Sequence, residues 1–256
     1  MKKSSATILV FMLFSVSAFA QSRVNAKDIL KSIDEGKAVN LRGTEIVGDL
    51  NMTSIKDKVP DKDNKRSRNS TKVFWYHVRT PLSFVDCSFK DDVIAYYHDD
   101  KKKETHNAVF HAVVSFEGCE FQGKSAFKYS KFHKDSDFTK TTYHEEALFK
   151  YSEFSTEVSF ANSVFSNDAN FKYTSFPRKV DFGNVEFHDH ANFKYTKFPR
   201  GVSFKNSVFQ DSSDFKYTEF YEPFNFDGTE FGDSVNFKYT KLEGKPFIKY
   251  LLKNKK

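Results

Sequence analysis

Six lysine–tyrosine pairs recur at one fixed spacing and place ammonium and phenol groups at regular intervals along this chain. An ammonium group attracts carboxylate, sulfate or phosphate, and an aromatic ring can stack on a sugar. The pattern therefore predicts a face that binds an anionic polymer. The other interpretation is that duplication of a repeat has copied the pairs with no ligand involved, and the sequence leaves both open. The pairs are Lys128 and Tyr129, Lys150 and Tyr151, Lys172 and Tyr173, Lys194 and Tyr195, Lys216 and Tyr217, and Lys238 and Tyr239.

Aromatic and histidine side chains gather beside two polar, charged stretches near residues 58–72 and 96–109. Aromatic residues next to loops that interrupt a regular pattern are where a binding site is expected. The alternative is that these side chains pack beneath the loops as a small satellite core. The candidate residues, which include the only tryptophan of the chain, are Trp75, Tyr76, His77, Arg79, Tyr96, Tyr97 and His98.

Motifs for catalysis and cofactor binding are absent from the sequence. The chain has no glycine-rich phosphate loop, no HExxH, no CxxC and no GxSxG. His188 and His190 could offer two imidazoles to a metal ion, but no third ligand follows at a suitable spacing. We therefore expect a solvated turn there, and we predict no catalytic residue, no metal and no cofactor.

A strict rhythm of large apolar residues must position these side chains. From Phe110 to Leu242 such a residue recurs at steps that alternate between five and six, and 23 of the 25 positions are Phe; the others are Tyr143 and Leu242. The residue two positions earlier is nearly always small or β-branched, so both are predicted to point inward as a wedge and a spacer. Self-similarity at a period of about 22 residues indicates a solenoid of stacked four-sided coils.

Units such as Ala169-Asn170-Phe171 and Ala191-Asn192-Phe193 give the chain a resemblance to the pentapeptide-repeat family, whose units read Ala-Asp/Asn-Leu/Phe-x-x. The resemblance covers roughly residues 39–242. It implies an all-β fold, a right-handed four-sided β-helix of about eight coils. The extra residue at alternate sides of each coil departs from the family pattern, and a looser coil with more interior to fill explains why Phe replaces Leu.

Cys87 and Cys119 each lie two residues before a Phe of this rhythm, in FVDCSF and FEGCEF. If an insertion separates them, they occupy one column of neighbouring coils, about 4.8 Å apart. That separation is compatible with a disulfide, and small buried free thiols fit the position equally well. The sequence favours neither alternative.

Run backward from Phe110, the rhythm requires two insertions, near 58–72 and 96–109, which read as polar loops. On this interpretation the corner column that later holds the FKY units begins with Leu41, Val73 and Ala95.

The first residues of the chain read as a leader. Lys2 and Lys3 precede a short apolar run and small residues at 17–20. Residues 1–20 are therefore predicted to be a bacterial signal peptide that directs a periplasmic or secreted product. No later stretch is apolar for long enough to cross a membrane.

Both ends of the predicted solenoid have a candidate cap. Residues 21–38 are predicted to form a capping helix with Asn25 as its N-cap. Residues 243–256 are predicted to form a C-terminal cap with a basic tail. Its apolar members would be Phe247, Ile248, Tyr250, Leu251 and Leu252.

These features predict an exported, non-catalytic repeat protein that acts as an interaction or structural scaffold for an unknown protein. The alternative is a module that binds carbohydrate or another anionic polymer of the cell envelope. The resemblance suggests a third function, because some family members mimic DNA and block gyrase. This chain is basic, with a net charge of +6 that is evenly spread, so we expect no nucleic-acid partner or mimicry. The sequence names neither the partner nor the oligomeric state.

Overall fold

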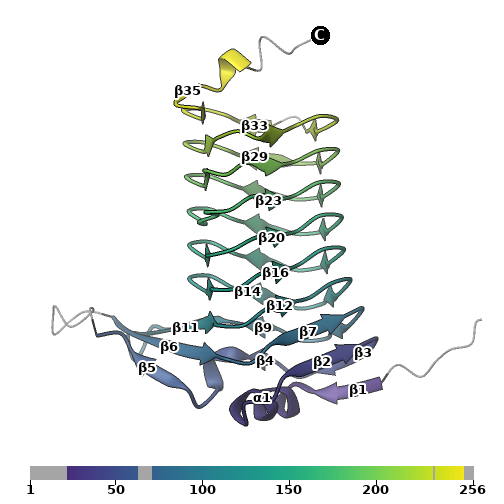
Figure 1. Cartoon of the computed structure of the whole chain (residues 1–256), viewed down its shortest axis with the longest axis vertical. Helices are drawn as coiled ribbons and strands as arrows, with labels where there is room; N and C mark the ends of the chain where they lie inside the picture. Colours follow the sequence, from purple (N-terminus) through teal and green to yellow (C-terminus); the bar gives the residue numbers. More distant parts are fainter. Residues whose placement is uncertain (1–21, 63–70, 233, 251–256) are drawn as a thin grey trace, which may run out of the picture.

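The computed structural model describes residues 22–62, 71–232 and 234–250, so the predicted signal peptide lies outside the described residues. The chain forms a rod of stacked coils in which parallel strands line four faces (Figure 1). We call the faces A, B, C and D, and each coil visits them in the order B, A, C, D. Faces B and C each hold eight strands, which confirms the prediction of about eight coils.

The strands are mostly two residues long and stack face by face. Face A consists of β1 (Ser22–Asn25), β3 (Thr44–Val47), β8 (Ser88–Phe89), β13 (Glu120–Phe121), β17 (Thr142–Tyr143), β21 (Val164–Phe165), β24 (Glu186–Phe187), β28 (Val208–Phe209) and β32 (Glu230–Phe231). Face B consists of β2 (Val39–Arg42), β7 (Leu82–Val85), β12 (Val114–Ser115), β16 (Ser136–Asp137), β20 (Val158–Ser159), β23 (Val180–Asp181), β27 (Val202–Ser203) and β31 (Phe224–Asn225). Face C consists of β4 (Leu50–Asn51), β9 (Val93–Ile94), β14 (Ser125–Ala126), β18 (Ala147–Leu148), β22 (Ala169–Asn170), β25 (Ala191–Asn192), β29 (Ser212–Asp214) and β33 (Ser234–Asn236). Face D consists of β6 (Lys72–Val78), β11 (Glu104–Phe110), β15 (Lys131–Phe132), β19 (Glu153–Phe154), β26 (Lys197–Phe198), β30 (Glu219–Phe220) and β34 (Lys241–Leu242), with single bridges through Ser175 joining its two halves.

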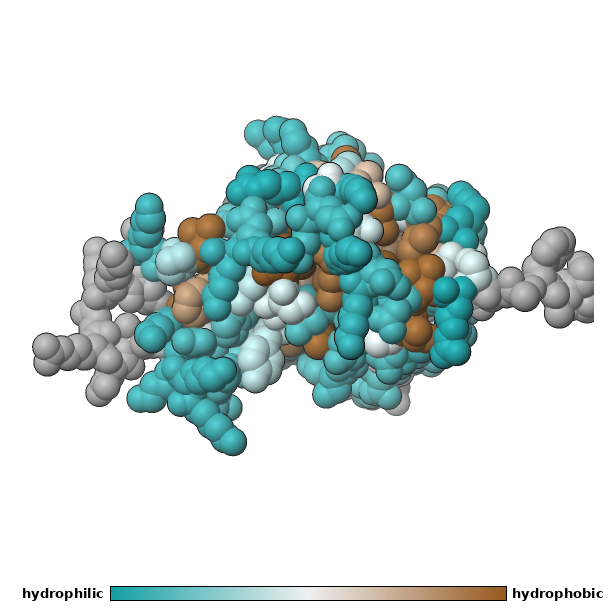
Figure 2. All heavy atoms as spheres, turned by 90° about the horizontal axis from the view of Figure 1, so that it is seen from below, coloured by the Kyte–Doolittle hydropathy of each residue, from teal (hydrophilic) through white to brown (hydrophobic). Residues whose placement is uncertain are grey.

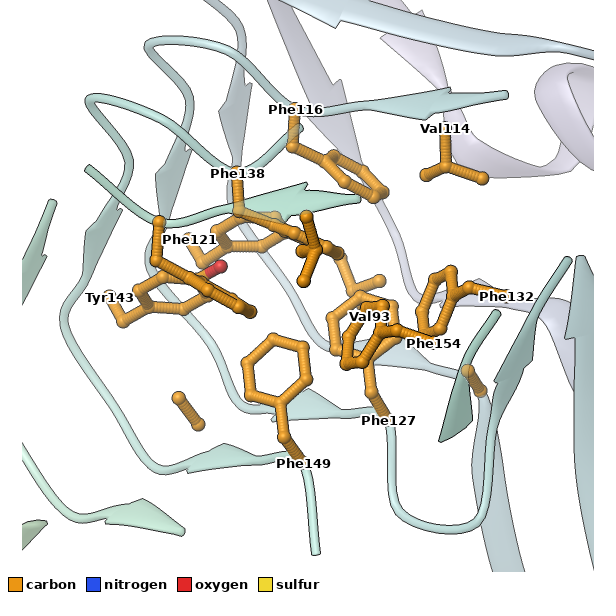
Figure 3. Close-up of a cluster of buried hydrophobic side chains, with 14 of the residues drawn as sticks. Val93, Val114, Phe116, Phe121, Phe127, Phe132, Phe138, Tyr143, Phe149 and Phe154 are labelled. Carbon is orange, nitrogen blue, oxygen red and sulfur yellow. The ribbon is translucent and has the colours of Figure 1, made fainter. Parts of the chain in front are cut away.

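Strand register confirms the period that the sequence predicts. Ala147 pairs with Ala169, and Ala169 with Ala191, so equivalent residues stack directly. Each buried small residue leaves room for the Phe two positions later, and the Phe rings stack along the rod (Figure 3). The ring centroids of Phe149 and Phe193 each lie 5.1 Å from that of Phe171. The fold therefore rests on four continuous columns of aromatic wedges.

Buried hydroxyl groups tie neighbouring coils together. Ser152, Thr174, Thr196 and Thr218 are buried, and each donates a hydrogen bond to the carbonyl oxygen of the Phe 25 residues earlier, at 2.6–2.8 Å. These bonds satisfy hydroxyls that would otherwise be desolvated without a partner.

The N-terminal end is closed by α1 (Ala26–Asp34), as the sequence predicts. The Asn25 side chain accepts a hydrogen bond from the backbone N–H of Lys27 at 2.9 Å, and Ile29 and Ile33 are buried. Strand β1 precedes the helix and pairs with β3, an element that the sequence did not reveal. Figure 2 views this end, where hydrophilic side chains cover most of the visible surface.

The C-terminal end is covered by a short antiparallel strand, β35 (Lys245–Pro246), and by aromatic side chains. Phe247 is fully buried, and the ring of Tyr250 lies 4.9 Å from that of Phe224. Ile248 is 53% exposed, so its expected role in the cap is wrong; Leu251 and Leu252 lie outside the described residues. Within the described part of the chain, no helix is long and apolar enough to span a bilayer.

The two insertions contain strands rather than the irregular loops that the sequence suggested. Strand β5 (Lys58–Pro60) pairs antiparallel with β6, and β10 (Tyr96–Asp99) pairs antiparallel with β11. Strands β6 and β11 then run parallel along seven residues. Pairing satisfies backbone groups that loops would have left to water. Figure 1 shows β5 and β6 projecting sideways from the rod beside β11, and we call β5, β6, β10 and β11 the wing.

The predicted register of the first coils is partly wrong. Leu41 pairs with Phe84 on face B, and Val73 pairs with Thr105 in the wing, so neither belongs to the corner column. By the pairing of β4 with β9, Met52 takes the first place in that column. Before Phe84 the inward positions hold Leu, Ile, Met and Val instead of Phe. No single residue type then marks the inward positions, so the register cannot be counted from the sequence.

Candidate functional site

The lysine–tyrosine pairs form one straight column at the corner between faces C and D. We call the six lysines and six tyrosines from Lys128 to Tyr239 the Lys–Tyr column. Consecutive tyrosine rings lie 4.5–4.9 Å apart and within 17° of parallel. Each lysine Nζ lies 5.1–5.4 Å from the ring centroid of its own tyrosine. Ammonium and phenol groups therefore alternate along one edge of the rod.

The column tyrosines adopt an unusual backbone conformation. All six have φ between +58° and +62°, in the left-handed region that bulky residues rarely occupy. A left-handed non-glycine residue costs about 1–2 kcal/mol, and stacking of one ring pair returns about 0.5–1.5 kcal/mol. At the opposite corner, between faces B and A, Lys140 is an exception among left-handed residues that are otherwise Gly, Asn or Asp: Asp86, Gly118, Asn162, Asn184, Asn206 and Gly228. Tyrosine is therefore not the residue that the turn itself favours.

The positive charge of the column has no ion-pair partner in the part of the chain that the structure describes. Among the residues that the structure describes, no ion pair includes a lysine of the column. On the adjoining face D, by contrast, Lys131 pairs with Glu153 at 3.5 Å and Lys197 with Glu219 at 3.3 Å. The column thus offers a line of unpaired cations about 24 Å long.

The stacked rings change the expected mode of contact. A gap of 4.5–4.9 Å between centroids leaves no room to insert a sugar between two rings. Inside the column only ring edges, hydroxyls and ammonium groups reach solvent. The expectation that sugars stack on these rings is therefore wrong for all but the terminal rings, and recognition must be polar.

The structure joins part of the predicted loop site to this column. The Tyr96 ring lies 5.8 Å from that of Tyr129, and Lys128 Nζ lies 3.1 Å from the Tyr96 hydroxyl. Trp75 and His98 lie beside them and line the same pocket between the wing and the rod. The two candidate sites that the sequence separates are therefore one continuous surface.

The other four loop residues have structural partners. Tyr76 is buried, and its hydroxyl lies 2.9 Å from His106 Nδ1. Arg79 pairs with Asp57 at 2.7 Å. Tyr97 is 49% exposed, and its ring lies 5.8 Å from that of His106. These residues do not line the pocket beside the column, and the satellite-core interpretation holds for Tyr76.

His77 belongs to a row of three imidazoles on neighbouring coils. His77 Nδ1 lies 2.7 Å from His111 Nε2, and the His111 and His133 rings lie 4.9 Å apart. Burial lowers the pKa of His77 and of His111. One nitrogen of the close pair must donate and the other accept, so at least one of the two rings is neutral.

Sequence reasoning missed three residues of this surface. Asn107 and Asp61 line the pocket with Trp75, and Lys131 Nζ lies 4.8 Å from the Trp75 ring. Asn107 belongs to β11 of the wing, Asp61 follows β5, and Lys131 begins β15 of the rod. These three segments meet only after folding. No signal in the sequence pairs positions so far apart.

The two cysteines are free thiols in the structure. Cys87 and Cys119 stack on neighbouring coils, as their register predicts, and both are buried. A side-chain hydrogen bond with Cys87, together with burial, raises the pKa of the Cys119 thiol. Of the two alternatives, the structure therefore has the reduced pair packed in the core.

His188 and His190 point to different partners. His188 Nε2 lies 3.0 Å from a Glu186 carboxylate oxygen, and His190 Nδ1 lies 2.8 Å from the Ser212 hydroxyl. Within the described ranges, no group of three or more His, Cys, Asp or Glu side chains is arranged to hold a metal ion.

Comparison with protein families gives one match. The family model described as pentapeptide repeats (9 copies) matches residues 106–153, 149–197 and 193–241, which together span 136 of the 256 residues. Searches of curated proteins and of solved structures returned no match.

Proposed function

Because this chain belongs to the pentapeptide-repeat family, we propose that it is a non-catalytic interaction scaffold whose Lys–Tyr column binds an anionic polymer of the cell envelope. The signal-peptide pattern at residues 1–20 supports export to a compartment where such polymers occur. The rod contributes spacing rather than reactivity, since it repeats one ammonium and one phenol about every 4.8 Å.

One observation carries the proposal: six left-handed positions hold tyrosine next to a lysine that forms no ion pair with any described residue. The same rod fills its opposite left-handed corner mostly with Asn, Gly and Asp, which fit that backbone better. A purely structural corner would gain no net stability from tyrosine over those residues, because the stacking of the rings does no more than offset the cost of the backbone conformation. A ligand-binding role explains why the costly residue and the repelling cations are both kept.

The chemistry of the column favours a polymer with regularly spaced anions. Carboxylates or phosphates meet the ammonium groups, and oxygen atoms of the same polymer accept from the tyrosine hydroxyls. Because the contact is charged and exposed, its strength must fall as salt rises. A neutral polymer has no anionic group to pair with the lysines.

The test is a binding titration of the mature chain with polygalacturonate, with dextran as the neutral control. In one variant Lys150, Lys172, Lys194 and Lys216 are changed to Gln. At about 0.5 kcal/mol per exposed ion pair, the four changes should weaken binding by about 30-fold. The loss should shrink at high salt.

A matched control changes the same amount of charge elsewhere. Lys134, Lys179, Lys205 and Lys241 are exposed lysines outside the column, and their replacement by Gln should leave most of the affinity intact. Equal losses in the two variants would show that the polymer senses net charge only, and would remove the column as a specific site.

A further inference from the structure

A pocket opens where the wing meets the rod, at the N-terminal end of the Lys–Tyr column. Its volume is about 500 Å³, within the range of roughly 300–1,000 Å³ that is typical of small-ligand sites. Figure 1 shows the wing leaving the rod at this level. We call this cavity the wing pocket; the residues that matter most in its wall are Trp75, Tyr96, His98, Asn107, Lys128 and Tyr129.

Asn107 gives the pocket a buried acceptor without a donor. The residue is 2% exposed, and its Oδ1 has no hydrogen-bond partner within the part of the chain that the structure describes. A desolvated acceptor with no donor is unfavourable and calls for an explanation. Because Asn107 lines the wing pocket, an O–H or N–H group of a bound ligand would supply the missing donor.

Lys128 gives the pocket a cation held at a fixed place. Its Nζ lies 3.1 Å from the Tyr96 hydroxyl and 4.6 Å from the Tyr96 ring centroid. No carboxylate of the described residues forms an ion pair with it, so the ammonium can receive an anionic group of a ligand.

Trp75 gives the pocket an aromatic wall of fixed orientation. Its indole N–H donates to Asp61 Oδ2 at 3.2 Å, and Lys131 Nζ lies 4.8 Å from the ring centroid. The wing pocket thus combines an aromatic wall, a buried acceptor and an unpaired cation. These three features together match a ligand with an apolar ring face, a hydroxyl and a negative charge.

We propose that the wing pocket binds one acidic sugar unit, a pyranose that carries a carboxylate. The carboxylate meets Lys128, a ring hydroxyl donates to Asn107 Oδ1, and the C–H face of the sugar packs against Trp75 and Tyr96. The proposal rests on the proposed function and deepens it, because the 5.8 Å contact between Tyr96 and Tyr129 makes pocket and column continuous. A polymer whose end unit fills the pocket can run on along the column.

The sole tryptophan of the chain makes the pocket directly observable. We would titrate the mature protein with D-galacturonate and follow Trp75 fluorescence, with D-galactose as the uncharged control. We expect a saturable change with the acid and binding at least about tenfold weaker for the neutral sugar. Absence of saturation with D-galacturonate, or equal affinity for both sugars, would overturn the proposal.

Two variants test the contacts separately. Asn107→Leu removes the orphan acceptor with little change in volume, so the fold should be retained, which circular dichroism checks. Lys128→Gln lies at a part-exposed corner and removes the two contacts of Lys128 with Tyr96 of β10, so its fold is checked by circular dichroism as well. Each should weaken D-galacturonate binding about tenfold or more. Unchanged affinity in both variants would refute the assignment of these groups.

A galacturonate hexamer separates this proposal from the polymer-binding function. The hexamer should bind more tightly than the monomer because it reaches the column as well. In a Lys150→Gln/Lys172→Gln variant this gain should disappear while monomer binding stays the same. A hexamer that binds no better than the monomer would contradict the column and leave the pocket standing; failure of the monomer alone would contradict the pocket.

Discussion

Replacing Phe171 with alanine would leave a cavity in the core of the regular rod, near the middle of its length. The ring is fully buried and is stacked between Phe149 and Phe193, with centroids at 5.1 Å on both sides. The rings of Phe160 and Phe182 lie edge-on to it, both at 5.2 Å. A fifth aromatic ring, that of Phe165, lies 5.8 Å from it.

The expected cost follows from how little the neighbours can move. Phe-to-Ala changes in cores cost about 3–5 kcal/mol, with the higher values where the cavity stays open. Coils above and below Phe171 are held by backbone hydrogen bonds and cannot close the space, so we expect about 4–5 kcal/mol. Phe237 is a matched control, because it lies in the last coil, is part-exposed and stacks on only one Phe of its column. Phe237→Ala should cost about half as much.

Thermal unfolding followed by circular dichroism measures both variants. For a chain of this size, about 4–5 kcal/mol corresponds to a fall in Tm of about 8–20 °C. Hydrogen exchange should show lost protection in the coils that flank position 171, because each coil contacts only its neighbours. Equal losses for Phe171→Ala and Phe237→Ala would refute the picture of a continuous stack that is weaker at its end.

Two further predictions concern hydroxyls and histidines. Thr196 Oγ1 donates to the Phe171 carbonyl oxygen at 2.7 Å, so Thr196→Val should cost about 0.5–1.5 kcal/mol in chemical denaturation, whereas Thr196→Ser should cost less because it keeps the bond. Burial lowers the pKa of His77 and His111 below the usual 6.5, against the opposing charge of Asp57 and with the help of Arg79 and His133. The unfolded chain therefore binds more protons below about pH 6.5, and stability should fall as the pH falls through that range. His111→Gln should flatten the dependence of Tm on pH between about 7.5 and 5, and an unaltered profile would count against the row of imidazoles.

The regular part of the fold could be predicted because one residue type marks every inward position. From Phe110 onward the wedge is almost always Phe, so the register of four faces follows from counting. Before Phe84 the inward-pointing residues vary in type, and the predicted register is wrong at Leu41 and Val73. The wing could not be predicted, for a different reason. Its parallel strands pair positions far apart in the chain, such as Lys72 with Glu104, and their charged sequences resemble those of loops.

The candidate site was predictable only as far as it repeats. The Lys–Tyr column is visible in the sequence because equivalent positions stack. The sequence does not show that each tyrosine has a left-handed backbone, or that the rings stack too closely to admit a sugar. Both follow from the geometry of the corner. Asn107 stands out only once the wing lies against the rod and leaves its oxygen without a partner among the described residues.

Four tyrosines of the column offer the sharpest test of whether it exists to bind or merely to stack. Tyr151, Tyr173, Tyr195 and Tyr217 would be changed to Asn, a residue that the rod itself uses at its opposite left-handed corner. Relief of backbone strain at the four sites (about 4–8 kcal/mol) and loss of the five stacked ring pairs that they form (about 2.5–7.5 kcal/mol) largely cancel. We predict that the variant folds with nearly unchanged Tm and binds polygalacturonate much more weakly. A variant that loses stability heavily and still binds the polymer would show that the tyrosines hold the coils together and that the column is not the binding face.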